Sequence, residues 1–244
     1  MGLFSNKISR EELQTGDHIY SWRPYYSYAH HGIYIGDNKV IHFTRGRGQE
    51  TGTGTILDNL LISWVPHRSF QHCSECRHNM QNSNGVVVSC LECFLHGRAI
   101  YRFEYGVDTA TFLAKARGGT CTHAKADPVE DVLHRAFHLL ENGFGGYHLF
   151  RNNCEDFAMY CKTGLLVLSP NVQGRSGQAA TALLGVPLAA SLLYPATLAV
   201  GAGVYCLSRY AVDLGIRDDV VKIPVEDLAV NLGWSSSSVP NEQN

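Results

Sequence analysis

Apolar and polar positions alternate along the first part of the chain in the way that β-strands do. Short alternating runs occupy 17–21, 33–35 and 40–43, with turn residues between them. The segment 36–39, Gly-Asp-Asn-Lys, separates the second run from the third and predicts a β-hairpin. A further alternating run, 99–105, follows much later in the chain. These runs predict a small antiparallel sheet.

Two later segments have the three-to-four-residue apolar spacing of amphipathic helices. The first starts near Pro128, with Asp127 at the capping position and Gly143 at the end. Its predicted buried stripe is Val129, Val132, Leu133, Ala136, Phe137 and Leu140. The second starts at Cys154, after Asn153 as N-cap. We therefore expect an α+β fold with the sheet packed on these helices, and shorter helices over 112–117 and 224–232.

A long uncharged segment lies near the C-terminus. Residues 176–208 contain no Asp, Glu, Lys or Arg, and 188–207 is long enough to cross a bilayer, although Pro195 interrupts it. Two structures fit this composition: a helix embedded in a membrane, or a buried helical hairpin packed on the rest of the protein. We favour membrane association through 188–208. The expected organisation is a main domain over 13–168, an apolar segment over 176–210 and a tail over 211–244.

Composition and charge narrow the class of protein. A hydrophobic content of 45% with 24 glycines indicates a globular chain. The net charge of −2 argues against a dedicated nucleic-acid-binding protein, which would carry a basic surplus. No secretory leader is recognised, so we expect a cytoplasmic protein whose eight cysteines are mostly reduced. Gly2 is a partial match for myristoylation, because Asn6 replaces the expected Ser or Thr.

Four cysteines have the spacing of a metal site. Cys73-x-x-Cys76 and Cys90-x-x-Cys93 are separated by 13 residues, and each pair can present two thiolates to one side. This pattern predicts one structural zinc ion within a zinc-ribbon-like insert over 66–98, with no open position for catalysis. The alternatives are two disulfides, four unrelated thiols, or one ligand replaced by His72, His78 or His96. No organic cofactor is expected.

Cys154 is a candidate nucleophile. The partial positive charge at a helix N-terminus favours thiolate over thiol, although a buried structural cysteine is also compatible with the sequence. His30 and His42 lie on the two sides of the predicted hairpin. A three-residue turn places both imidazoles on one face of the sheet. A two-residue turn opposes His42 to Ile33 and separates them, unless a bulge near Gly32 restores the match.

These residues carry a family resemblance. The segment 30–42, His-His-Gly-Ile-Tyr-Ile-Gly-Asp-Asn-Lys-Val-Ile-His, and the later Asn153-Cys154-Glu-Asp-Phe resemble the lecithin:retinol acyltransferase family, or NC domain. That family is a circularly permuted relative of the NlpC/P60 papain-like thiol enzymes. The resemblance extends from about residue 15 to residue 166. The cysteine-rich insert and the closing segments are similar to its plant, lead-sensitive-like branch.

The resemblance implies roles for three residues. Cys154 would be the nucleophile that accepts an acyl chain from membrane phospholipid as a thioester, His30 its general base, and His42 the third group that orients the imidazole. The acyl chain would then pass to an amine, an alcohol or water. Register with the family motif favours His30 over His31 as the base. A protein partner cannot be named from the sequence.

One position departs from the family pattern and leaves other functions open. Asp156 stands where the animal acyltransferases usually have histidine, two residues after the nucleophile. The substitution leaves the acyl acceptor undetermined. The alternatives are a non-catalytic, membrane-associated binding or regulatory protein and, more distantly, a thiol peptidase or deamidase.

Overall fold

The computed structural model describes residues 6–23, 28–44, 73, 85–115, 118–145, 153–167 and 195–228. Six strands form one sheet in the order β1-β6-β2-β3-β4-β5, and every neighbouring pair is antiparallel. These strands are β1 (Lys7–Ile8), β2 (His18–Trp22), β3 (Ala29–Gly36), β4 (Lys39–Thr44), β5 (Gly85–Cys90) and β6 (Ile100–Arg102). The predicted antiparallel sheet is therefore present.

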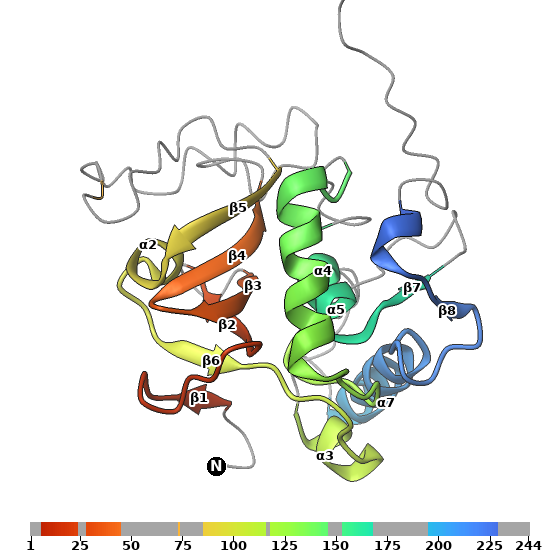
Figure 1. The fold of residues 1–244 in the computed structure, drawn as a ribbon. Coiled ribbons are helices and arrows are strands. Elements are labelled where there is room, and N and C mark those ends of the chain that lie inside the picture. The colour runs from red at the N-terminus through yellow and green to blue at the C-terminus, as the bar shows by residue number, and fades with distance from the viewer. Residues whose placement is uncertain are drawn as a thin grey trace, which may run out of the picture.

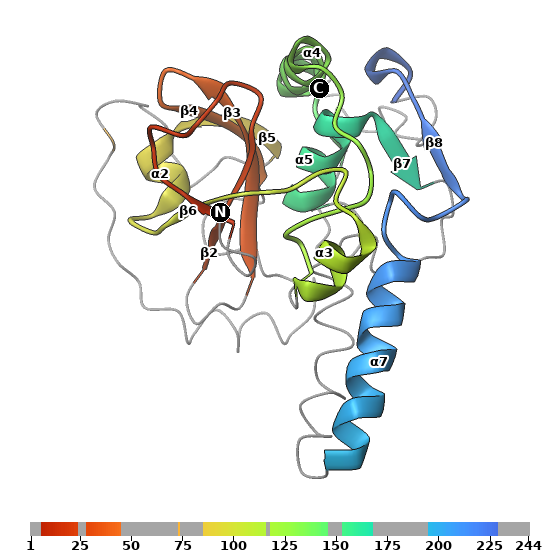
Figure 2. The same cartoon turned by 90° about the horizontal axis from the view of Figure 1, so that it is seen from below.

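Helices and a second, two-stranded sheet complete the described part. The helices are α2 (Leu91–Leu95), α3 (Thr109–Ala114), α4 (Val129–Asn142), α5 (Cys154–Thr163), α7 (Pro195–Ala211) and the 3-10 turn η2 (Val225–Asp227). Strands β7 (Leu165–Val167) and β8 (Val220–Lys222) pair with each other. In both views α5 lies between the large sheet and the β7–β8 pair (Figure 1 and Figure 2). This arrangement confirms the α+β prediction.

The two faces of the large sheet contact different helices. Ile33, Ile41 and Phe43 point to the face covered by α5 and α4, where they meet Phe157 and Ala158. The opposite face packs against α2 through a second apolar cluster, listed here in full: Ile8, Ile19, Val40, Leu91, Phe94, Leu95 and Ile100. Because side chains alternate along a strand, neighbouring residues of β3 and β4 belong to different cores.

Helix α4 begins and packs differently from the prediction. Its N-cap is Pro128, and no side chain caps it. Val129 and Phe137, both predicted in the buried stripe, are 41% and 43% exposed. The buried face of α4 consists of Val132, Arg135, Ala136 and Leu139. The C-terminal end matches the prediction, since the backbone of Gly143 has φ +85°, a conformation that glycine adopts without strain.

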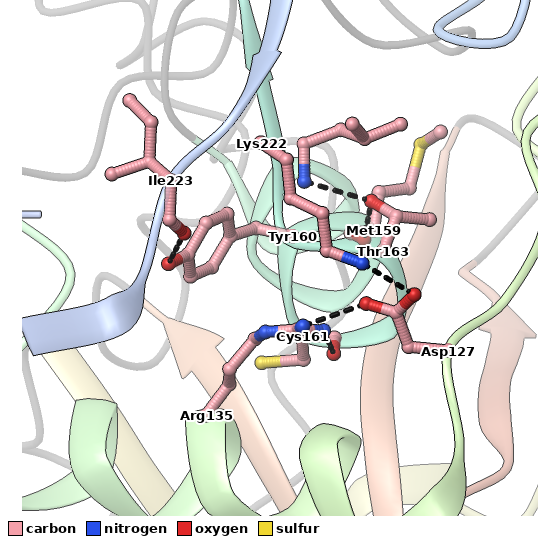
Figure 3. A network of polar contacts seen from close by, with 9 residues as sticks. Asp127, Arg135, Met159, Tyr160, Cys161, Thr163, Lys222 and Ile223 are labelled. Atoms are coloured by element: carbon pink, nitrogen blue, oxygen red, sulfur yellow. Dashed lines mark hydrogen bonds and ion pairs between the residues drawn. The ribbon is translucent and has the colours of Figure 1, made fainter.

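A network of charges explains why Asp127 does not cap α4. Its two carboxylate oxygens accept hydrogen bonds from Arg135, at 2.6 Å, and from Lys222 of β8, at 2.7 Å (Figure 3). Arg135 also donates to the backbone oxygen of Cys161 at 3.0 Å, and Tyr160 donates to the backbone oxygen of Ile223 at 2.9 Å. The network therefore joins α4, the end of α5 and the β8 segment.

The cysteine-rich region is partly built into the large sheet. Strand β5, which lies inside the predicted insert 66–98, pairs with β4 along its whole length, from Lys39↔Cys90 to Thr44↔Gly85. Helix α2 follows at once and supplies three side chains to the second core. The later half of the predicted insert is thus part of the main fold instead of a separate unit.

The uncharged segment enters the described part of the chain only from residue 195. Within the described residues, no helix has both the length and the apolar character that crossing a bilayer requires. Helix α7 extends away from the sheets, and its C-terminal end lies near α3 (Figure 2). There the buried Arg209 donates to the backbone oxygen of Lys115 and lies 4.7 Å from the Phe112 ring. This end of the helix is therefore docked on the protein.

Two short helices differ from their predicted bounds. The helix expected over 112–117 spans Thr109–Ala114, because the Asp108 side chain accepts a hydrogen bond from the Thr111 backbone and starts it earlier. The helix expected over 224–232 is a single 3-10 turn, Val225–Asp227, in the residues that are described. The rest of that predicted range lies largely outside them.

Candidate active site

A capping box starts helix α5 at Cys154. The Asn153 side chain accepts hydrogen bonds from the backbone of Glu155, at 2.8 Å, and of Asp156, at 3.1 Å. In return, the Asp156 carboxylate accepts one from the Asn153 backbone at 3.0 Å. The predicted N-cap is confirmed, and Cys154 is the first residue of the helix. Asp156, the departure from the family pattern, thus stabilises the helix start.

The Cys154 thiol lies on the backbone of β3. Its Sγ is 3.8 Å from the backbone oxygen of Ala29, within reach of a weak S–H···O hydrogen bond, and the residue is 3% exposed. Phe157 and Ala158, one turn further along α5, pack against Ile33 and its neighbours in the first core. The helix therefore holds Cys154 beside the residue that immediately precedes His30.

The β3–β4 hairpin places His30 and His42 on one face of the sheet. The turn has two residues, Asp37 and Asn38, with φ of +47° and +55°, which is typical of a type I′ turn. The register then shifts between Tyr34 and Gly36, where a bulge occurs. Beyond the bulge the pairing is Ile33↔Ile41, which places His42 opposite Gly32. The bulge therefore restores the shared face that a two-residue turn alone would remove.

The two imidazoles contact each other directly. His30 Nε2 and His42 Nδ1 are 2.9 Å apart, and His42 Nε2 is 3.0 Å from the Ser89 hydroxyl on β5. Both rings are buried. Burial holds the pKa of His30 well below its ordinary value of 6.5, and the positive charge of Arg23 acts in the same direction. Burial therefore favours the neutral form of the His30 imidazole over the protonated one.

A second histidine network occupies the opposite face. His31 Nδ1 is 2.8 Å from His18 Nε2, and His18 Nδ1 is 2.7 Å from the Tyr105 hydroxyl. Phe103 stacks on His18 at 4.5 Å between ring centroids, and Tyr20 stacks on His31 at 5.3 Å. The doublet His30-His31 thus supplies one imidazole to each face. The His30 ring lies on the side of Phe94 of α2, and the His31 ring lies on the side of Tyr20, which packs with Met159 of α5.

Three of the four predicted metal ligands converge. The sulfur atoms of Cys73, Cys90 and Cys93 all lie within 4.8 Å of one another, and such a group could hold a metal ion. Cys76 lies outside the described residues, as do His72 and His78. His96 is described, but it does not belong to the group of thiols that the described residues form.

Sequence reasoning missed three residues around the histidine pair. They are Ser89, Phe94 and Arg23. Ser89 forms a hydrogen bond with His42, and the ring centroids of Phe94 and His30 are 5.3 Å apart. Arg23 donates to the backbone oxygen of Phe94 at 3.1 Å. The continuous apolar run Val86-Val-Val before Ser89 could have indicated a strand. Its pairing with β4 spans a long insertion and leaves no local signal.

Comparison with known proteins identifies the family. The family model described as Lecithin retinol acyltransferase matches residues 11–167. The chain is 58% identical over 241 residues to Protein LEAD-SENSITIVE 1 of Arabidopsis thaliana, covering 95% of this chain and 92% of the relative. It is 27% identical over 137 residues to Lecithin retinol acyltransferase of Mus musculus, covering 56% of this chain and 49% of the relative. The chain is therefore a member of the lecithin retinol acyltransferase family, in its plant branch.

Proposed function

We propose that this protein is a thiol-dependent acyltransferase or phospholipase-type hydrolase, with Cys154 as nucleophile, His30 as general base and His42 as the third group. One observation carries the proposal. The Cys154 thiol, at the first residue of α5, lies 3.8 Å from the backbone oxygen of Ala29. His30 follows Ala29 in the chain, and its imidazole is hydrogen-bonded at 2.9 Å to that of His42. The resemblance to the family's thiol motif assigns the roles.

The chemistry follows from the charge state of His30. Because burial keeps this imidazole neutral, it can take the proton of the Cys154 thiol while the sulfur attacks an acyl ester carbonyl. The ester oxygen then leaves as an alcohol with that proton, and an acyl thioester remains on sulfur. An amine, an alcohol or water attacks the thioester next, and Cys154 regains its proton. His42 orients the His30 ring, and Ser89 orients His42 in turn.

The proposed acyl donor is phospholipid at a membrane surface. The mouse relative's name refers to lecithin and to acyl transfer. The uncharged segment 176–208 provides apolar surface that suits membrane association on the cytoplasmic side. Most of this segment lies outside the described residues, and association through 188–208 is part of this proposal. The proposal also includes the circularly permuted papain-like topology of the fold.

We further propose one structural zinc ion on Cys73, Cys76, Cys90 and Cys93. Four thiolates in two Cys-x-x-Cys pairs suit tetrahedral zinc and leave it no open coordination position. The convergence of the three described thiols supports this assignment. The ion would stabilise the fold and would not contact the reacting atoms.

A second candidate function is binding without catalysis. Cys154 is 3% exposed and His30 is fully buried, and an enzyme must bring its substrate to these groups. That burial favours a family member that uses the same fold to bind lipid or to regulate other proteins at a membrane. Enzymatic turnover separates the two candidates.

The test is release of lysophospholipid from vesicles of phosphatidylcholine by the full-length protein, measured by mass spectrometry. Wild-type protein is expected to release it, and Cys154→Ala is expected to reduce release to background. Cys161→Ala is the matched control in the same helix: burial raises the pKa of the Cys161 thiol and keeps it protonated. Equal release by Cys154→Ala and the wild type would refute the proposal, and vesicle binding without release would favour the second candidate.

A further inference from the structure

The distances within the cysteine cluster match a metal site better than a disulfide. Cys73 Sγ and Cys90 Sγ are 3.6 Å apart. A disulfide requires about 2.0 Å. Two thiolates on one tetrahedral zinc, each at about 2.3 Å from the metal, lie about 3.8 Å apart. The cluster is therefore arranged as ligands around a shared ion.

A backbone hydrogen bond prepares one of these sulfurs to carry negative charge. The Cys93 amide donates to Cys90 Sγ at 3.4 Å. Such N–H···S bonds stabilise a thiolate and orient its remaining lone pairs outward, as hydrogen bonds to metal ligands generally do. The sequence pair Cys90-x-x-Cys93 thus folds as a metal-binding turn at the junction of β5 and α2.

This turn is flanked by two residues that contact the histidine pair. Ser89, directly before Cys90, is 3.0 Å from His42 Nε2. Phe94, directly after Cys93, has its ring 5.3 Å from His30 and 5.5 Å from His42. Any displacement of the turn would therefore move both contacts together.

The turn stands at the end of the sheet's last strand. Strand β5 is one of the two edge strands of the six-stranded sheet, and it pairs with β4. The Leu91 amide donates to the backbone oxygen of Asn38 at 2.7 Å, which fixes one end of the turn to the hairpin. Cys73, 17 residues earlier in the chain, offers a second attachment through the shared ion. A bound ion would cross-link this sheet edge, where β5 pairs with one neighbouring strand, β4.

We propose that a metal ion held by the thiolates of Cys73, Cys90 and Cys93 positions the His30–His42 pair by fixing Ser89 and Phe94 against it. Zinc is the divalent ion that thiolates at these distances suit best. On binding, the ion displaces the thiol protons, so each new metal–sulfur bond releases one proton to solvent. Only the catalytic consequence of this positioning rests on the proposed function; the positioning itself is a structural property.

The first part of the test measures metal binding. Full-length protein is stripped with a chelator and titrated with zinc, and the stoichiometry and proton release are measured. Wild-type protein is expected to bind one zinc and release protons, whereas Cys73→Ser is expected to bind roughly tenfold more weakly or worse. Cys206→Ser, a cysteine of α7 outside the cluster, is the matched control and should bind as the wild type does. A stoichiometry well below one in the wild type would overturn the proposal.

The second part reads the histidine pair directly. The ¹⁵N signals of the His30 and His42 rings report their tautomers and their order, independently of any activity. We expect one sharp set with zinc, shifted or broadened signals without it, and the zinc-free pattern in Cys73→Ser. Ser89→Ala keeps the three thiols, so it should bind zinc as the wild type does and yet shift the His42 signals. This variant tests the contact between Ser89 and His42 even if Cys73→Ser does not fold.

Two outcomes separate this inference from the proposed function. Ring signals that are identical with and without bound zinc would overturn the positioning role, even in an active enzyme. Zinc-dependent ring signals in a protein that forms no thioester would leave the positioning role intact and refute the proposed catalysis.

Discussion

His30→Gln is expected to lower the rate of thioester formation about 10²–10⁴-fold, the usual contribution of a positioned general base. Glutamine retains a hydrogen-bonding group that can reach His42, but it cannot accept the thiol proton. Because burial holds the pKa of His30 well below 6.5, the wild-type imidazole is a neutral base throughout the physiological pH range. The measurement is the initial rate of protein acylation by phosphatidylcholine vesicles, followed by intact mass.

His31→Gln is the matched control for this prediction. It removes the neighbouring imidazole, which contacts His18 on the opposite face of β3. We expect a loss of stability, because the buried network with His18 and Tyr105 is broken, but less than about a tenfold change in acylation rate at a temperature where the variant is folded. A larger effect at His31 than at His30 would contradict the assignment of the base.

Arg135→Met is expected to lower the free energy of unfolding by about 2–4 kcal/mol at neutral pH. The substitution keeps most of the side-chain volume but leaves the Cys161 backbone oxygen and one Asp127 oxygen without their buried donor. Removing one member of a fully buried pair costs about 3–5 kcal/mol, and the partial exposure of Asp127 reduces this. Urea denaturation of the wild type and the variant measures the difference.

Acid should remove the part of this difference that comes from Asp127. Burial alone would raise the pKa of Asp127, but hydrogen bonds from Lys222 and Arg135 outweigh it and lower the pKa below its ordinary value of 3.8. A carboxyl group with a lowered folded-state pKa contributes stability above pH 3.8, and this contribution is lost as pH falls through the folded value. The cost of Arg135→Met should therefore shrink in this range, as the protonated carboxyl loses its ion pairs.

Arg10→Met provides the comparison for an exposed ion pair. Arg10 pairs with Glu92, and their side chains are 52% and 54% exposed. Such pairs contribute about 0.2–1 kcal/mol, so this variant should unfold nearly as the wild type does. A cost of Arg135→Met no larger than that of Arg10→Met would contradict the structural role of the network.

The sequence predicts the elements well where local signals are strong. Asn153 followed by Asp156 indicates a helix start, and the structure has both sides of that capping box. The hairpin at Asp37–Asn38 is equally local. Its register is not, because the shift between Tyr34 and Gly36 has no distinct sequence signal, and it decides whether His42 shares a face with His30.

Long-range partners explain the remaining differences. Asp127 has the residue type and position of a helix cap, but Arg135 and Lys222 bind its carboxylate in the folded protein. Arg135 interrupts the predicted apolar stripe for the same reason. Ser89 meets His42 only because β5 pairs with β4 across a long insertion, and no local pattern reports such a pairing.

The central claim is that the Cys154 sulfur becomes acylated, and intact-mass analysis tests it most directly. Full-length protein is incubated with phosphatidylcholine vesicles and quenched in acid. Its intact mass is measured, and the protein is then digested to peptides to locate the modification. The account predicts a wild-type adduct of fatty-acyl mass on Cys154, removable by hydroxylamine, and no adduct on Cys154→Ala. A folded wild-type protein that acquires no adduct, or an adduct that persists in Cys154→Ala, would contradict it.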